Sequence, residues 1–171
     1  MTGAGEGGAE GTGRAADLPW VDEHAAELGA PVGVAWPALL RTVERMTAGG
    51  AAPRYARAVG CADTGPGGPR PLEVGSTIPG FHVGALVPER ELTLLGSHRF
   101  SDYALVFRLE GLGGRRSRLV AETRGDFPGL KGRAYRALVI GTRMHALVIR
   151  RVLRNVARRV TASPAAPGKV R

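Results

Sequence analysis

The chain is poor in cysteine and lysine, and each shortage narrows the class of protein. Cys61 is the only cysteine among 171 residues, so one chain can build neither a disulfide framework nor a cysteine-based metal cluster. Only Lys131 and Lys169 are lysines among 24 basic residues, a bias typical of GC-rich coding. The sequence also lacks the basic start and apolar run of a signal peptide, so we expect a cytoplasmic protein.

Acidic residues are absent from the last quarter of the chain. Residues 1–127 hold 13 basic and 15 acidic residues, whereas residues 128–171 hold 11 basic residues and no acid. The net charge of +9 therefore comes from the C-terminal segment alone. Since arginine bias accounts for much of the basic total, we do not expect nucleic acid as a partner. Weak contact with an anionic membrane surface is one expectation from this charge.

A long uninterrupted apolar run is also missing. Arg143 and Arg150 break the apolar pattern of residues 133–159 at a spacing of seven, so this segment cannot cross a bilayer, which needs about 20 mostly apolar residues. At about 100° per residue, the segment predicts one amphipathic helix from near Pro128 to about Val160. Its apolar stripe holds Leu138, Thr142, His145, Ile149, Val152 and Val156. Its opposite, basic face holds Arg136, Arg143, Arg150, Arg154 and Arg158, with Ile140 and Leu147 among them.

The rest of the chain predicts one domain between two tails. Residues 1–17 are rich in Gly and Ala and predict a flexible N-terminal tail, and residues 161–171 predict a second one. Between them, residues 18–160 form the domain. Residues 20–28 predict a strand, and Pro31 suits the first turn of a following helix. Residues 48–71 predict a loop with one short helix inside it.

Four further segments predict an antiparallel sheet, namely residues 78–87, 91–99, 102–110 and 117–124. Apolar and polar residues alternate in residues 91–99 and in residues 102–110. The two patterns place their apolar residues on the same face when Arg99 pairs with Asp102 and His98 with Tyr103. One face then carries Leu92, Leu94, Leu105, Phe107 and Leu109. On the neighbouring strands, the same face takes Phe81, Val83, Ala85, Leu119, Ala121 and Thr123.

This order of elements resembles the START-like, Bet v 1-type helix-grip superfamily (SRPBCC). The segments that carry the resemblance are EHAAELGAPVGVAW, PERELTLLGSHRFSDYALVFRLE and FPGLKGRAYRALVIGTRMHAL, and it covers roughly residues 20–158. More narrowly, the chain resembles uncharacterised bacterial members grouped with polyketide cyclase/dehydrase-like proteins. The resemblance implies an α+β fold in which a curved antiparallel sheet wraps around a long C-terminal helix and encloses a cavity.

A sheet that curves strongly around one helix leaves space that side chains do not fill, and such cavities commonly admit an apolar small molecule. The candidate lining residues are Phe81, Val83, Leu94, His98, Tyr103, Leu105, Phe107, Ala121, Thr123, Leu138, Thr142, His145 and Ile149. His145 with Thr142, and His98 with Tyr103, are its polar pairs. Each pair also has a purely structural interpretation, as a satisfied core histidine or a cross-strand contact.

No catalytic constellation stands out. The four histidines have no metal-binding spacing, no Gly-rich phosphate cradle follows a strand, and no cofactor is expected. Our first hypothesis is therefore the binding of a small lipophilic molecule between the sheet and the C-terminal helix. A second is a cyclase- or dehydratase-like enzyme that uses His145, His98 or Tyr103 as acid or base. A third is an interaction protein that docks through the basic face.

Overall fold

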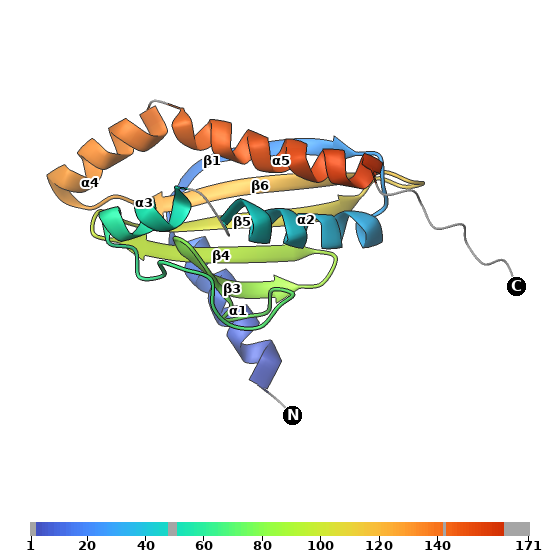
Figure 1. Cartoon of the computed structure of the whole chain (residues 1–171), viewed down its shortest axis with the longest axis horizontal. Helices are drawn as coiled ribbons and strands as arrows, with labels where there is room; N and C mark the ends of the chain where they lie inside the picture. The colour runs from blue at the N-terminus through green and yellow to red at the C-terminus, as the bar shows by residue number, and fades with distance from the viewer. Residues whose placement is uncertain (1–2, 48–50, 142, 163–171) are drawn as a thin grey trace, which may run out of the picture.

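A computed structural model describes residues 3–47, 51–141 and 143–162, and these form one antiparallel sheet with helices on both faces. The strands are β1 (Trp20–Leu28), β2 (Thr77–Ile78), β3 (Phe81–Val87), β4 (Glu91–His98), β5 (Ser101–Gly111) and β6 (Ser117–Asp126). The helices are α1 (Gly3–Asp17), α2 (Val32–Thr47), α3 (Ala52–Val59), α4 (Gly129–Arg136), the π-helical turn η1 (Ala137–Gly141) and α5 (Met144–Ala162). The strand order is β1-β6-β5-β4-β3-β2, which leaves β1 at one edge (Figure 1).

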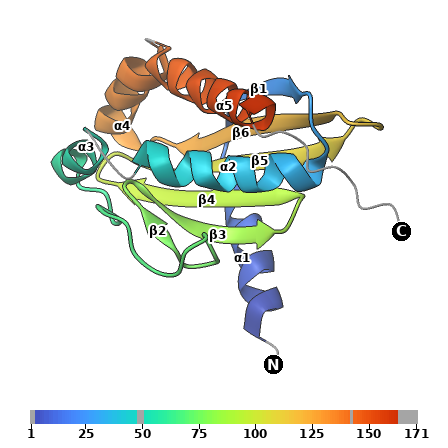
Figure 2. The ribbon, with the colours of Figure 1, turned by 45° about the vertical axis from the view of Figure 1, so that its right-hand side comes forward.

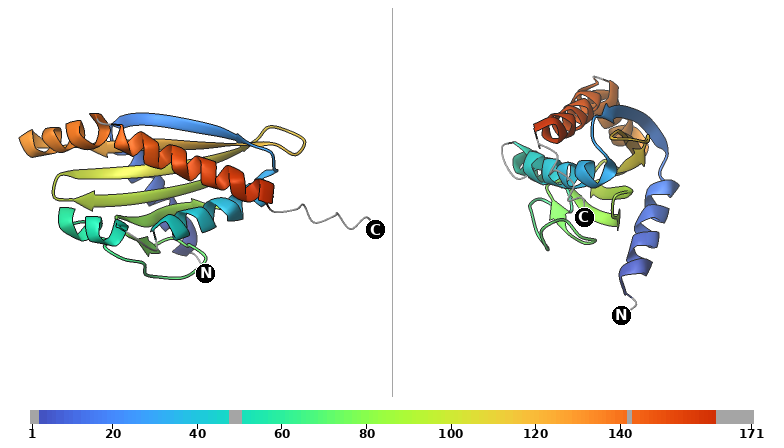
Figure 3. Two further views of the ribbon diagram at one scale, coloured as in Figure 1. Left: turned by 45° about the horizontal axis from the view of Figure 1, so that its top comes forward. Right: turned by 90° about the vertical axis from the view of Figure 1, so that its right-hand side faces the viewer.

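The inner face of the sheet, defined here as the face toward α2 and α5, carries the main core. Phe107, Leu94 and Leu119 from the strands are fully buried there, as are Leu39 of α2 and Val156 of α5. Helices α2 and α5 lie side by side across this face, while α1 lies on the opposite, outer face (Figure 3). The sheet is therefore covered on both sides, by α2 and α5 on one and by α1 on the other.

The predicted faces of the β4–β5 hairpin are confirmed, but its predicted partners are wrong by two residues. Ser101 pairs with His98 and Tyr103 with Gly96, so the turn is Arg99–Phe100. A shift of two keeps every side chain on its face, which is why burial alone could not distinguish the two registers. The His98 ring favours the observed turn, because its Nδ1 accepts the Phe100 N–H at 3.1 Å.

One predicted inner-face residue lies on the outer face instead. The register of β3 shifts between Val83 and Ala85, and Ala85 then pairs with Thr93, whose side chain faces outward. Leu86 takes the inner position and packs against the main core. A β-bulge of this kind exchanges the two faces within one residue, and its local sequence signal is Gly84, an isolated glycine inside the strand.

The N-terminal segment is a second correction, since it forms helix α1 and packs on the sheet where we expected a flexible tail. Gly11 lies so close to Gly84 of β3 that a Cβ atom built on Gly11 would stand 2.0 Å from the Gly84 oxygen. Ala15, buried to 3 % exposure, packs with Leu95 and Val106 on the outer face. The glycines that suggested flexibility are therefore used, in part, for close backbone contact.

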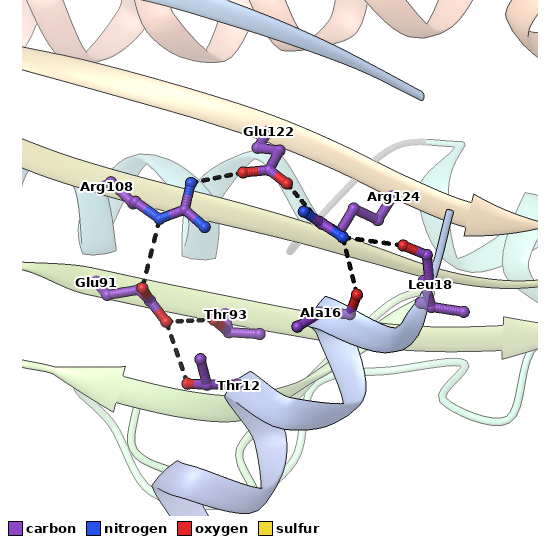
Figure 4. A network of polar contacts seen from close by, with 8 residues as sticks. All are labelled: Thr12, Ala16, Leu18, Glu91, Thr93, Arg108, Glu122 and Arg124. Atoms are coloured by element: carbon purple, nitrogen blue, oxygen red, sulfur yellow. Dashed lines mark hydrogen bonds and ion pairs between the residues drawn. The ribbon is translucent and has the colours of Figure 1, made fainter. Parts of the chain in front are cut away.

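A buried ion network fixes the end of α1 to the sheet (Figure 4). Glu122, 5 % exposed on the outer face of β6, accepts hydrogen bonds from Arg108 and Arg124. Arg124 also donates to the carbonyl oxygens of Ala16 and Leu18, at 2.9 and 3.0 Å. Burial alone would raise the pKa of Glu122, but the two arginines outweigh it and hold that pKa below its ordinary range.

The single long C-terminal helix that we expected is broken. Residues 129–136 form α4, residues 137–141 form the π-helical turn η1, and Arg143 takes a left-handed backbone conformation with φ 60°. Leu138, predicted on the buried stripe, is 66 % exposed as a result. Gly141 lies at the break, and glycine inside a helix costs about 1 kcal/mol relative to alanine. The last helix, α5, continues to Ala162, and residues 163–171 of the expected C-terminal tail lie outside the described residues.

Replacing Glu122 with Gln is expected to lower the free energy of unfolding by about 2 kcal/mol, because two arginines lose the carboxylate that they share. Since the folded-state pKa of Glu122 is lowered, this stabilisation is present above the ordinary pKa of a glutamate and disappears as the pH falls through the folded-state value. Urea unfolding at several pH values measures both effects.

A matched control is Glu27→Gln. Glu27 contacts Arg116 at 3.8 Å, but both side chains are exposed, so its loss should leave stability nearly unchanged. Equal effects of the two variants would contradict a structural role for the buried network.

Candidate functional site

One end of the inner face is lined by aromatic side chains. We call this group the aromatic cluster: Phe81, His98, Phe100, Tyr103, Phe127 and Tyr135. Every member is half-buried, in contrast to the fully buried Phe107 in the middle of the sheet. Helices α3 and α4 lie at one end of the sheet, beyond α5 (Figure 2), and Tyr135 of α4 contacts His98 of β4 in the cluster. A chain with only 5 % aromatic residues thus concentrates most of them at one place.

Tyr103 is the best-anchored member of the cluster. Its hydroxyl donates to the Gly80 carbonyl oxygen at 2.7 Å and lies 3.6 Å from Cys61 Sγ. Its ring lies over Gly96, where a Cβ atom would stand 2.5 Å from the ring. Burial, followed by the hydrogen bond with Cys61, raises the pKa of Tyr103 strongly. The phenol therefore stays protonated and acts as a hydrogen-bond donor.

Helix α4 is held over this end by two of its residues, Tyr135 and Gly132. Tyr135 stacks on Phe100 and Phe127, and its hydroxyl shares a hydrogen bond with that of Tyr55 in α3. Gly132 lies against the backbone of Phe127, so a Cβ atom there would clash at 2.5 Å. The contacts of Tyr135 and Gly132 therefore attach α4 to the aromatic cluster. The π-turn η1 connects α4 to α5.

The contacts of His98 indicate a structural role in the hairpin turn and give less support to a role in proton transfer. Its Nδ1 accepts the Phe100 N–H, and its Nε2 lies 3.3 Å from Ser101 Oγ. Burial lowers the pKa of His98, although the nearby Asp102 carboxylate opposes this. Its ring contacts Tyr135 at 4.6 Å and Tyr103 at 5.3 Å between centroids. Of the predicted polar pairs, His98 and Tyr103 are thus in contact, although they are not directly paired across the strands.

A polar group lies further along the same face, between β1, β6 and α5. His145 Nε2 lies 2.7 Å from Thr123 Oγ1 and 3.5 Å from Asp22 Oδ1. The other Asp22 oxygen, Oδ2, lies 3.4 Å from His24 Nε2. Asp22 Oδ1 and His24 Nε2 are buried atoms that have no hydrogen-bond partner among the described residues. These two atoms can therefore form further hydrogen bonds, either with a ligand or with a group that takes part in a proton transfer.

Burial lowers the pKa of His145, the attraction of Asp22 raises it in part, and the neighbouring His24 lowers it again. The net result is a histidine that stays neutral near physiological pH. A neutral imidazole accepts protons, so this residue has the protonation state that a general base requires.

The predicted site residues divide into three groups. Packed fully into the core are Val83, Leu94, Phe107, Ala121 and Ile149, each at most 2 % exposed. Half-buried at the site are Phe81, His98, Tyr103 and His145, and between them lie the buried Leu105 and Thr123, at 8 % and 7 % exposure. Leu138 is exposed on the broken helix, and Thr142 lies outside the described residues.

Sequence reasoning missed Asp22 and His24, to which it gave no role in the site. A signal was present, because strict alternation along β1 places both on one face with Ala26 and Leu28, and Leu28 is only 1 % exposed. It also missed Phe100, Phe127 and Tyr135. These lie at a turn, a linker and a short helix, where periodicity carries no information about packing.

The predicted basic face is exposed. Arg136, Arg143, Arg150 and Arg154 all lie at the surface, and Leu147 among them is 58 % exposed. Within the described ranges, no helix is long and apolar enough to span a membrane. The described residues likewise hold no group of three or more His, Cys, Asp or Glu side chains that could bind a metal ion.

No family model and no curated protein matches the sequence, whereas solved structures do. Norcoclaurine synthase from Thalictrum flavum, in complex with dopamine and hydroxybenzaldehyde, is 11 % identical with a TM-score of 0.53, over 85 % of this chain and 88 % of that one. The Zhui aromatase/cyclase from Streptomyces sp. R1128 is 14 % identical with a TM-score of 0.48, over 87 % and 98 %. A conserved protein from Geobacillus kaustophilus is 15 % identical with a TM-score of 0.42, over 82 % and 91 %.

The fold is thereby defined. The chain is an α+β protein in which an antiparallel six-stranded sheet is covered by a C-terminal helix, the Bet v 1-type helix-grip fold. This is the fold that the sequence resemblance implied.

In a pH titration followed by NMR, the ring signals of His145 are expected to shift with a midpoint below the ordinary value of 6.5. Replacing Asp22 with Asn should lower the midpoint further, because the carboxylate favours the protonated ring. Glu23→Gln, a neighbour on the other face of β1, should leave it unchanged. A midpoint that rises on loss of Asp22 would contradict this geometry.

Proposed function

We propose that this domain binds a small lipophilic molecule, aromatic in part, on the inner face of the sheet beneath α4. The observation that carries the proposal is the aromatic cluster. Its six rings contact one another, yet none is fully buried, so this end of the sheet presents apolar surface that the fold itself does not cover. Aromatic rings gain most of their favourable energy from burial and from offset or edge-to-face contact, and an aromatic ligand supplies both.

The polar groups set the orientation of such a ligand. On the inner face, Tyr103 lies opposite Gly125 and Leu105 lies opposite Thr123, so the two polar centres are two residues apart along β5 and β6. The Tyr103 hydroxyl lies at one side of a ligand placed over Leu105, and His145 with Thr123 lies at the other. A mostly apolar lining with a few polar groups is the usual composition of a small-molecule site.

Entry beneath α4 is consistent with the broken helix. The π-turn η1 and the left-handed Arg143 separate α4 from α5, so α4 can move without disturbing the core residues Ile149 and Val156. The two hollows described in this structure lie elsewhere, under α1 and beside β1. Ligand binding beneath α4 therefore requires that α4 moves outward, so that Tyr135 exchanges its contact with His98 for one with the ligand.

Binding is tested with the neutral fluorescent probe N-phenylnaphthylamine. NMR signals of Phe100, Tyr103 and Tyr135 are expected to shift on titration, whereas those of Trp20, an exposed aromatic outside the cluster, stay in place. Replacing Tyr135 with Ala should lower the affinity for the probe several-fold to about tenfold, because one aromatic contact is lost. Trp20→Ala is the matched control.

Signal changes confined to the basic face, or equal effects of the two variants, would overturn the proposal. Native mass spectrometry of freshly purified protein complements the titration, because a retained molecule would identify the chemical class of the ligand.

A second function, acid–base catalysis on the bound molecule, is favoured by one specific observation. His145 is kept neutral by burial and lies within hydrogen-bonding distance of Thr123, while Asp22 stands ready to stabilise the protonated ring. In this arrangement His145 removes a proton from a carbon atom of the bound molecule.

The catalytic competence of His145 is tested with nitrobenzisoxazole, from which a base removes the ring C–H proton while the N–O bond breaks to give a coloured nitrile phenolate. Wild-type protein should accelerate this reaction with a pH profile that follows the titration of His145. His145→Gln should abolish the acceleration, and His82→Gln, a histidine paired with Asp63 on the outer face, should preserve it. Equal rates for wild type and His145→Gln would exclude His145 as the base.

A further inference from the structure

A groove of about 380 Å³ lies at the edge of the core, between the edge strand β1 and helix α5. Its apolar lining comes from Ala25 and Ala26 of β1 and from Leu147, Leu153 and Ala157 of α5. The volume falls within the range of roughly 300–1,000 Å³ that is usual for small-molecule sites. Helix α5 and strand β1 are in contact and lie next to each other at this edge of the sheet (Figures 1 and 3).

Two guanidinium groups border this groove. Arg150 and Arg154 both line it, and a spacing of four residues places them on the same side of α5, one turn apart. Neither arginine has an ion pair within the part of the chain that the structure describes, and residues 128–171 contain no acid. Glu23 and Glu27 flank Ala25 on β1, but Glu27 contacts Arg116, and among the described residues neither acid forms an ion pair with Arg150 or Arg154. The apolar groove thus has uncompensated positive charge at its rim.

We infer that this groove is a binding site for a single-chain anionic amphiphile, a molecule of the fatty-acid type, with its chain against Ala25, Leu147 and Leu153 and its carboxylate on Arg150 and Arg154. Charge complementarity selects the occupant. An apolar ligand alone leaves the two cations without partners, and an inorganic anion leaves the alanine and leucine surface exposed. A carboxylate bound by arginine forms charge-assisted, often bidentate, hydrogen bonds.

This site is separate from the one proposed under α4. Leu147 and Arg150 face the outside of α5, whereas His145 and Ile149 of the same helix face the sheet. An amphiphile in the groove lies along the free edge of β1, and it touches none of the aromatic cluster.

The experiment titrates the full chain with dodecanoate below its micelle concentration, using calorimetry. Wild-type protein is expected to bind dodecanoate and to bind dodecanol at least about tenfold more weakly, because the alcohol lacks the charge. The double variant Arg150→Gln/Arg154→Gln should lose about tenfold in affinity for dodecanoate. Ala25→Trp, which fills the groove, should abolish binding.

The matched control is Arg151→Gln/Arg158→Gln, which removes the same charge from exposed positions of α5 outside the groove. It should change the affinity less than about twofold. Equal losses in both double variants, or equal binding of dodecanol, would overturn the inference.

Two further measurements distinguish binding in this groove from binding under α4 and from binding to a membrane surface. Tyr135→Ala should leave dodecanoate binding unchanged, so failure of the site under α4 does not affect the outcome. If anionic vesicles bind wild-type protein and Ala25→Trp equally, while free dodecanoate binds neither, the arginines serve a membrane surface and the groove is not a site.

Discussion

The apolar inner face of β4, β5 and β6 must be covered, and two helices of limited length are available to cover it. Helices α2 and α5 bury the middle of the face, where Phe107 and Leu119 are inaccessible to water. Beyond α5, the cover is α4, which the π-turn sets at a different angle. The sheet therefore has a densely packed half and a half lined by partly exposed rings. The division between core and candidate site follows from where the helix breaks.

The sequence could predict the fold because the fold depends on periodicity. Alternation along β4 and β5 determined which residues face inward, and the seven-residue spacing of Arg143 and Arg150 excluded a membrane span. Partners within the hairpin could not be predicted to better than two residues, since burial is the same in both registers. The docking of α1 was also beyond reach, because it depends on a close backbone approach between Gly11 and Gly84, which are distant in sequence.

The candidate site could be predicted only in part, for a related reason. Tyr103 and His145 lie on periodic elements and were identified from the stripe that each belongs to. Tyr135 and Phe100 lie on a short helix and a turn, and their positions depend on the angle of α4, which follows from the break at residues 137–143. Helix propensity and amphipathicity both favoured a continuous helix there. The tertiary requirement, that Tyr135 lie over His98 while Ile149 lies over the sheet, overrides them.

The arginines of this chain have two different roles, although composition alone treats them alike. Arg108 and Arg124 on the outer face each contact Glu122, and their charge stabilises the docking of α1. Arg150 and Arg154 lie in a segment without acids, where no such pairing within the segment is possible. A charge that is compensated inside the fold contributes to stability, whereas an uncompensated charge beside an apolar groove is available to a ligand. The distribution of acids, more than the number of arginines, therefore determines which part of this surface can recognise an anion.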